Sequence, residues 1–245
     1  MRYFIFSDVH ANLEAFDAVL SAIAEEQVDR IIFLGDIVGY GAQPNEAVDR
    51  LKHLMPDAMI RGNHDKVIAS IEDGKSFQDL AYASAMWARL QIRPDNEAYL
   101  RGMPQGPITL EQEIQISHGS PHDEDFYILN QWDARPILHQ SKSWIVFYGH
   151  THLPMIYSTE SKFSQYFPEE DESYYRLSKD EQYLINPGSV GQPRDLNPKA
   201  SFALLDTDEN TICIKRVGYD IQTTQRKIRE AGLPIWHADR LAAGR

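Results

Sequence analysis

The sequence has a single cysteine, Cys213, among 245 residues, so no disulfide can form within the chain. We interpret Cys213 as a small residue of an apolar strand and not as a nucleophile. A chain without disulfides suits a reducing compartment, and we expect a cytoplasmic protein. Long apolar runs are also missing, since none approaches the ~20 residues that cross a bilayer. The sequence turns acidic at Asp8, too early for a signal peptide.

Basic residues are scarce. Lys and Arg total 24 against 36 Asp and Glu, which gives a formal net charge of −12. This balance disfavours a protein that holds long nucleic acid through an overall positive field, including a nuclease of that kind. A short single strand or a small nucleotide remains possible, because metal ions can dominate the charge of a local site.

The composition supports a sizeable core, since hydrophobic residues make up 42% of the chain. The length favours one large domain over two, and we expect residues 1–245 to form a single domain. The first third alternates apolar, strand-like runs at 2–7, 30–34 and 58–60 with helical stretches at 12–25 and 44–54. This βαβαβ pattern favours parallel strands joined by right-handed helical crossovers.

The second half is richer in strands. Helices are predicted at 76–103, 132–141 and 220–231, with helical pieces in the tail. Short strands are predicted at 107–110, 113–118, 143–148, 153–158, 182–186, 201–206 and 210–217. Together with the parallel strands of the first third, they predict an α/β fold of two packed sheets with helices outside.

The stretch 163–179 is polar and acidic around Glu169-Glu170-Asp171-Glu172. We interpret it as a solvated loop, with a lid over a binding site as the alternative.

Five short motifs each begin where a predicted strand ends. They are Asp8-Val9-His10, Gly35-Asp36, Gly62-Asn63-His64-Asp65, Ser117-His118-Gly119 and Gly149-His150-Thr151-His152. Asp8 and Asp36 lie 28 residues apart, and Asp36 and Asn63 lie 27 apart, each about one strand-helix unit. The carboxyl ends of parallel strands meet at one edge of a sheet, where α/β proteins bind their ligands. We therefore expect these side chains to converge.

Seven side chains of the motifs are candidate metal ligands, and one histidine is left unmatched. A mixture of carboxylate, amide and imidazole suits Mn²⁺, Fe or Zn²⁺ better than Ca²⁺ or a thiolate-rich structural zinc site. Seven ligands are too many for one tetrahedral ion, but two ions sharing one aspartate account for them. Two metals ~3.5–4 Å apart can activate water and stabilise both oxygens of an in-line displacement at phosphorus.

The motif set resembles the calcineurin-like metallophosphoesterase superfamily, whose pattern is D-x-H, G-D, G-N-H-[D/E], H and G-H-x-H. Every element is present in order over residues 8–152. The resemblance implies a four-layer αββα sandwich of two mixed sheets flanked by helices. It also implies that one divalent metal ion binds Asp8, His10 and His152, that a second binds Asn63, His118 and His150, and that Asp36 bridges them. Mn²⁺ or Fe is the expected metal, with Zn²⁺ as the alternative.

The resemblance leaves His64 as a non-ligand that protonates the leaving oxygen or steadies the phosphate while a metal-bound hydroxide attacks. An imidazole with a near-neutral pKa suits an alkoxide leaving group. Its neighbour Asp65 is a candidate to orient it. The alternative for His64 is a capping or packing role.

Two departures bear on the substrate. Protein phosphatases of this superfamily carry G-D-x-V-D-R-G, whereas this chain has Gly39 and Tyr40 in place of the acid and the arginine. This weighs against a protein phosphatase. It also leaves no assigned carboxylate to support the imidazole of His64. The runs 35–41, 61–65 and 186–194 resemble the compact bacterial branch near the YfcE-type phosphodiesterases, some of which act on dinucleoside polyphosphates such as diadenosine tetraphosphate.

Three further residues are candidate substrate contacts. Arg194 can hold a phosphate by paired hydrogen bonds, or form a surface salt bridge. Tyr40 can stack on a base, or pack beside the site. Asn12 can donate to a phosphate oxygen, or cap the helix that begins there. The remaining histidines are interpreted as structural or exposed, with His122 the one closest in sequence to a predicted ligand; they are His53, His122, His139 and His237.

The sequence therefore predicts a dinuclear-metal phosphodiesterase that acts on small nucleotide or dinucleoside polyphosphate substrates. A phosphomonoesterase is the alternative enzyme. The alternative of another class is a scaffold on the same fold, like the Vps29-like subunit of retromer. Loss of metal ligands would favour the scaffold, and here all seven remain.

Overall fold

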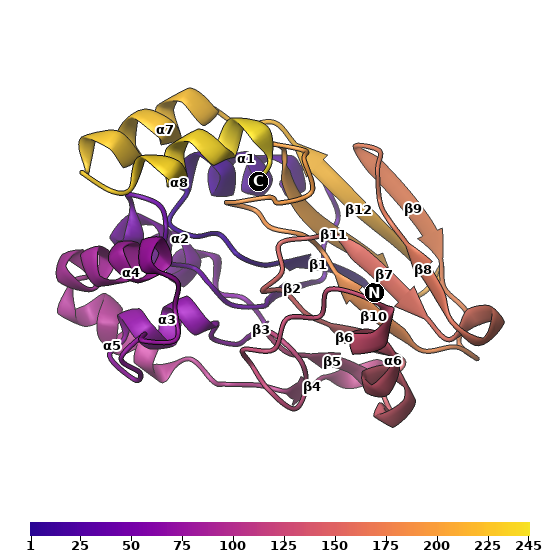
Figure 1. Ribbon diagram of the computed structural model, residues 1–245. Coiled ribbons are helices and arrows are strands. Elements are labelled where there is room, and N and C mark those ends of the chain that lie inside the picture. The colour runs from indigo at the N-terminus through magenta and orange to yellow at the C-terminus, as the bar shows by residue number, and fades with distance from the viewer.

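The computed structural model describes residues 1–111, 113–161 and 163–245, and this part of the chain forms two mixed β-sheets (Figure 1). The first sheet has the order β3 (Ala58–Met59), β2 (Arg30–Phe33), β1 (Arg2–Phe6), β11 (Ala200–Asp206), β12 (Thr211–Val217) and β9 (Glu172–Arg176). The second has the order β4 (Ile108–Thr109), β5 (Ile114–Ile116), β6 (Ile145–Phe147), β10 (Tyr183–Asn186), β7 (Met155–Ser158) and β8 (Ser164–Tyr166).

The helices are α1 (Leu13–Ile23), α2 (Pro44–Leu54), α3 (Asn63–Ile68), α4 (Asp79–Gln91), α5 (Pro94–Gly102), α6 (Gln131–Gln140), α7 (Ile221–Glu230) and α8 (Ile235–Asp239). Short 3₁₀ turns lie at η1 (Glu111–Glu113), η2 (Glu160–Lys162) and η3 (Arg240–Ala243). Among the described residues, no helix has the length and hydropathy needed to span a bilayer.

The alternation of apolar residues along β1 explains the layers. Successive side chains of a strand point to opposite faces of its sheet. Phe4 and Phe6 pack with Phe16 of α1 in a core that also holds residues of α2 and α4. Tyr3 and Ile5 instead join the core between the two sheets. One strand therefore contributes to two hydrophobic layers.

The outer face of the second sheet is covered by α6. Ala134, Ile137 and Leu138 of this helix pack on Val146 of β6 and Leu184 of β10. The order of layers is thus helices, first sheet, second sheet, helix. This confirms the αββα sandwich that the resemblance implied. In the first sheet β1, β2 and β3 are parallel, as their spacing predicted.

Two helix predictions were wrong in detail. The single helix predicted at 76–103 is divided into α4 and α5, because proline disfavours a helical conformation at the residue before it. Arg93, which precedes Pro94, has an extended backbone with ψ 150°. The helix α3 was not predicted at all. It begins inside the third motif, directly after Gly62.

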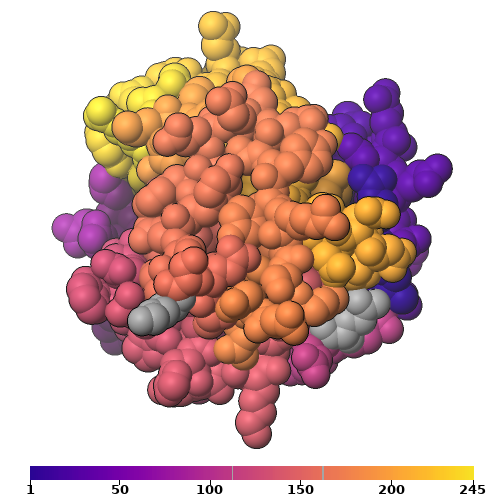
Figure 2. Space-filling model, turned by 90° about the vertical axis from the view of Figure 1, so that its right-hand side faces the viewer, coloured from indigo at the N-terminus to yellow at the C-terminus, as the bar shows by residue number. Residues whose placement is uncertain are grey.

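The loop predicted at 163–179 was also wrong, because this segment contains β8 and β9. Each is the last strand of its sheet, and β9 pairs with β12 from Thr211↔Arg176 to Lys215↔Glu172. Both strands lie on the right in Figure 1, away from α3 and α4, and Figure 2 shows their orange segments at the surface of that side. The alternative of a lid gains no support from this position.

We predict that Phe6→Ala lowers the free energy of unfolding by about 3–5 kcal/mol. Phe6 is fully buried, and its ring centroid lies 4.9 Å from that of Phe33 and 5.4 Å from that of Phe16. Leu90→Ala is the control, because Leu90 is 84% exposed and its loss should change stability by less than about 0.5 kcal/mol. Urea denaturation of both variants measures the difference, and equal shifts would contradict the assigned core.

Candidate metal centre and substrate pocket

The five motifs meet at one edge of the sandwich. Asp8 follows β1, Asp36 follows β2, and Asn63 opens α3 just after β3, so three parallel neighbours deliver three oxygen donors side by side. His118 follows β5 and His150 follows β6, which are parallel neighbours in the second sheet. The predicted ligands therefore come from both sheets, and all are buried, with at most 6% of each residue exposed.

Asp8, His10 and His152 form the first group of predicted ligands. Nδ1 of His10 lies 3.0 Å from the Val38 carbonyl, and Nδ1 of His152 lies 2.7 Å from the Gln192 carbonyl. Carbonyls only accept hydrogen bonds, so both histidines carry their proton on Nδ1 and keep a lone pair on Nε2.

Those lone pairs face each other, since the two Nε2 atoms are 3.0 Å apart. Nε2 of His152 is also 3.3 Å from Oδ1 of Asp8, which is buried without a hydrogen-bond partner. Three electron-rich atoms thus point at one another. A cation among them satisfies all three, so this donor set fits a metal ion.

The second group contains Asp36, Asn63, His118 and His150. His118 donates from Nδ1 to the Leu34 carbonyl at 2.8 Å, and its Nε2 lies 3.2 Å from Oδ1 of Asn63. His150 is oriented the other way. Its Nε2 lies 3.1 Å from the Asp125 carbonyl, which leaves Nδ1 as the nitrogen free to bind a metal.

Asp36 lies between the two groups. Its Oδ2 is 3.6 Å from Nε2 of His10 and 3.4 Å from Nε2 of His118. Its Oδ1 accepts the backbone N–H of His64 at 2.9 Å, which fixes the carboxylate plane. A single oxygen therefore faces both histidine sets, a position that suits a bridging ligand.

The electrostatics of the centre also favour cations. Burial alone would raise the pKa of Asp8, but the positive charge of neighbouring histidines brings it below its usual range. Burial opposes a charge on His118 as well, yet the carboxylates of Asp36 and Asp8 raise its pKa to about 10. Without metal, a proton on His118 offsets part of the buried negative charge.

Asp65 holds the turn that carries Asp36. Its carboxylate accepts the backbone N–H groups of Asp36 at 2.7 Å and Ile37 at 3.0 Å, and that of Gly62 at 2.9 Å. Burial and the Asp36 carboxylate raise the pKa of Asp65 to about 7, against the effect of these donors. The structure thus gives Asp65 a different role from the predicted one of orienting His64. Its carboxylate holds the Asp36 turn against the start of α3.

His64 is held by packing. Its ring centroid lies 4.4 Å from that of Tyr40 and 4.6 Å from that of Phe77, and burial lowers its pKa to about 4. Its Nδ1 is buried without a hydrogen-bond partner. A Cβ built on Gly39, whose φ is +99°, would overlap this nitrogen. The acid found in protein phosphatases at this point has no room here, and Nε2 is the nitrogen left for substrate.

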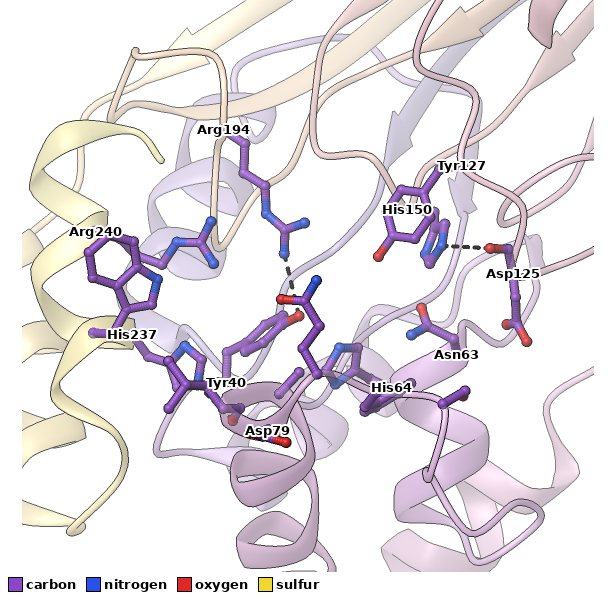
Figure 3. Close-up of a pocket in the computed structure, with 16 residues that line it drawn as sticks. Tyr40, Asn63, His64, Asp79, Asp125, Tyr127, His150, Arg194, His237 and Arg240 are labelled. Atoms are coloured by element: carbon purple, nitrogen blue, oxygen red, sulfur yellow. Dashed lines mark hydrogen bonds between the residues drawn. The ribbon is translucent and has the colours of Figure 1, made fainter.

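A pocket of about 700 Å³ opens over the centre (Figure 3). Asn63, His64 and His150 lie on its inner wall, and Arg194 and Arg240 lie across from Asn63 and His150. Other lining residues that the motifs did not indicate are Phe77, Asp79, Asp125, Tyr127, Trp236 and His237. The 163–179 segment contributes none of the lining residues.

The three candidate substrate contacts have different surroundings. Asn12 is 2% exposed and caps α1 by accepting the Ala15 N–H at 3.2 Å, so the structure favours its capping alternative. Tyr40 is packed against His64 and is 9% exposed, which favours packing beside the site. Arg194 reaches the pocket and forms no ion pair within the described ranges.

Sequence reasoning missed one histidine of the pocket. His237 is buried, lines the pocket, and lies with its ring centroid 4.9 Å from that of Tyr40. No motif surrounds it, and only the packing of the C-terminal helices brings it there. His53, His122 and His139 are exposed and do not line this pocket, in agreement with their interpretation.

Comparisons with known proteins agree with the geometry. The calcineurin-like phosphoesterase superfamily domain matches residues 1–210. The chain is 36% identical to an uncharacterised protein of Methanocaldococcus jannaschii, over 98% of this chain and 97% of that one. It is 24% identical to the phosphodiesterase YfcE of Escherichia coli K12, over 85% of this chain and 89% of YfcE.

Among solved structures, a metallophosphoesterase from Sphaerobacter thermophilus superposes with a TM-score of 0.88 at 37% identity, covering 100% of this chain and 99% of that one. Family, relatives and fold confirm the resemblance carried by the motifs, including its YfcE-like branch. The chain belongs to the calcineurin-like phosphoesterase superfamily and is a metal-dependent phosphoester hydrolase.

Proposed function

We propose that this protein is a cytoplasmic, single-domain phosphodiesterase with a dinuclear metal centre that acts on nucleotide or dinucleoside polyphosphate substrates. One observation carries the proposal. Oδ2 of Asp36 faces a histidine of each buried ligand group, and these groups lie beside a pocket that also holds His64. This arrangement matches the needs of an in-line displacement at phosphorus.

In this proposal one ion binds Asp8, His10 and His152, the other binds Asn63, His118 and His150, and Asp36 binds both. Mn²⁺ or Fe suits this oxygen and imidazole set, with Zn²⁺ as the alternative. When bound, two divalent cations supply the charge that activates water and stabilises the transition state.

His64 acts as a neutral donor. Because burial holds its pKa near 4, the ring is uncharged at neutral pH. Its Nδ1 is closed off behind Gly39, so the proton that it can share with the substrate is on Nε2. From the pocket wall this N–H steadies the leaving oxygen of the ester and offsets its growing charge.

The size of the pocket supports a substrate larger than a phosphomonoester of a small alcohol. A volume of about 700 Å³ is in the range of sites that enclose a whole organic ligand. The relative YfcE is named as a phosphodiesterase, which agrees with a diester. A phosphomonoesterase is the alternative that the assay below distinguishes.

Metal-stripped protein with added Mn²⁺ should hydrolyse bis-p-nitrophenyl phosphate and diadenosine tetraphosphate faster than p-nitrophenyl phosphate. Colorimetric release of nitrophenol and chromatography of the nucleotide products give the three values of kcat/KM. A preference for p-nitrophenyl phosphate would replace the diesterase by a monoesterase. Absence of turnover on all three, with two metals bound, would overturn the proposed substrate class.

His64→Ala should lower kcat by about 10²–10⁴-fold, the usual contribution of a positioned proton donor. The metal content should stay at two ions per chain, because His64 is outside both proposed ligand sets. His139→Ala is the control, since this histidine is exposed on α6. Steady-state kinetics measure kcat, and elemental analysis measures the metal content. A fall in both would show that His64 is a metal ligand.

Gly39→Ala should lower kcat by about 10- to 100-fold, because its Cβ displaces the ring of His64 from its place beside the pocket. Gly218→Ala is the matched control, since an added Cβ there meets no atom within 4 Å. Metal content should be the same in both variants. Equal kcat values would show that the position of His64 does not depend on Gly39.

Metal binding should release about one proton per chain near neutral pH, and affinity should rise with pH. The carboxylates raise the pKa of His118 to about 10, so a metal must displace its proton at any lower pH. Burial lowers the pKa of His150 to about 3, so that ring is already neutral. Calorimetric titration of Mn²⁺ in two buffers with different ionisation enthalpies counts the protons. Affinity that is independent of pH would contradict this assignment.

A further inference from the structure

Two arginines at one side of the pocket have no Asp or Glu partner among the described residues. Arg194 and Arg240 form no ion pair within the described part of the chain, although the protein has 36 acidic residues against 24 basic ones. Most arginines elsewhere pair readily, as Arg216 does with Asp195 and Arg229 with Asp239. Arg89, Arg135 and Arg176 also form no ion pair within the described ranges, but Arg194 and Arg240 are the two arginines that line this pocket.

The hydrogen bonds that Arg194 does form go to neutral atoms. Its Nη2 lies 2.9 Å from Oε1 of Gln192 and 3.4 Å from the hydroxyl of Tyr40. Its Nε is buried without a hydrogen-bond partner. Nη1 forms no hydrogen bond within the described ranges and is not buried, so its N–H donors are available to a ligand.

Arg240 comes from η3, far away in the sequence. Its Nε donates to the main-chain oxygen of Arg245, the last residue of the sequence, and no Asp or Glu side chain pairs with Arg240 within the described ranges. In Figure 3 its guanidinium group points towards the side of the pocket where that of Arg194 lies. Burial and the charge of Arg194 lower the pKa of Arg240 to about 10. The two like charges repel each other, and an anion between them would remove that penalty.

The acids that line the same pocket are placed elsewhere. Asp125 pairs with the buried Lys66 at 2.6 Å, beside the metal end. Asp79 is an exposed residue at the start of α4, on the lower wall in Figure 3. Neither forms an ion pair with the two arginines. The pocket is thus divided into a metal end and a cationic end, with His64 and Tyr40 between them (Figure 3).

We propose that Arg194 and Arg240 bind a second phosphate of the substrate, so that the preferred substrates carry a phosphate chain and not an isolated diester. This inference rests on the proposed function for the identity of the metal end. Guanidinium groups match phosphate oxygens through paired N–H donors. A substrate that spans the pocket has one phosphate at the metal end, beside Asp36, and the next phosphate between the two arginines.

The first test uses the metal-free protein and inorganic pyrophosphate as the probe, so it does not depend on catalysis. Calorimetric titration should give a Kd that rises about tenfold or more in Arg194→Gln and in Arg240→Gln, as expected for loss of a charged hydrogen-bond donor. Arg226→Gln is the control, because Arg226 is an exposed residue of α7 paired with Glu230 at 2.9 Å. Its Kd should equal that of the wild type.

The second test uses the Mn²⁺-loaded enzyme. For each variant, kcat/KM on diadenosine tetraphosphate should fall about tenfold further than kcat/KM on bis-p-nitrophenyl phosphate, which has no second phosphate. The melting temperature of Arg240→Gln should not be lower than that of the wild type, because the substitution removes a like-charge repulsion. This readout separates loss of binding from loss of folding.

The outcomes distinguish the two ideas. If the wild-type protein binds pyrophosphate no better than the Arg194→Gln/Arg240→Gln double variant, the second phosphate site is wrong. Equal losses on both ester substrates would also overturn it, since the arginines would then serve the reacting phosphate. If pyrophosphate binding depends on both arginines but no ester is hydrolysed, the proposed function fails while the anion site stands.

Discussion

Two carboxylates are buried among several histidine side chains, and this is the constraint on which the rest of the structure depends. Asp8 and Asp36 are 0% and 1% exposed, and a buried carboxylate is stable only when it is paired or bound to a cation. Protons can only partly replace metals there, because burial lowers the pKa of His10 and of His152 and so opposes a proton on their Nε2 atoms. The protein's own hydrogen bonds orient these donor atoms for metal binding.

The backbone shows what this arrangement requires. Asp8, His10, Asp36, His150 and His152 all have positive φ, between 51° and 64°, a conformation that residues other than glycine seldom adopt. Strained residues of this kind persist where the surrounding structure fixes them. Here the turns follow β1, β2 and β6, and the carboxylate of Asp65 holds one of them through its backbone amides. Sheet order and loop conformation thus act together to aim the ligands.

The sequence predicts this part well, because each ligand follows an apolar strand at a fixed point and the spacing reports the strand-helix unit. It predicts the remainder less well for physical reasons. Polar edge strands such as β9 lack the apolar alternation of a buried strand, so the segment resembled a loop. The pocket wall is set by packing between distant segments. Tyr127 and Arg240 are brought to one pocket by tertiary contacts that no local pattern records.

The predicted ligands and one wall of the pocket consequently come from different parts of the chain. Every predicted ligand, and His64, lies between residues 8 and 152, inside the 1–210 range that matches the superfamily domain. Trp236, His237 and Arg240 lie beyond that range, on α8 and η3, and they line the same pocket. Ile228 of α7, Ala238 of α8 and Leu241 of η3 pack together, so this wall has its own small core. Changes in the C-terminal segment can therefore reshape this wall of the pocket without altering the predicted metal ligands, none of which it contains.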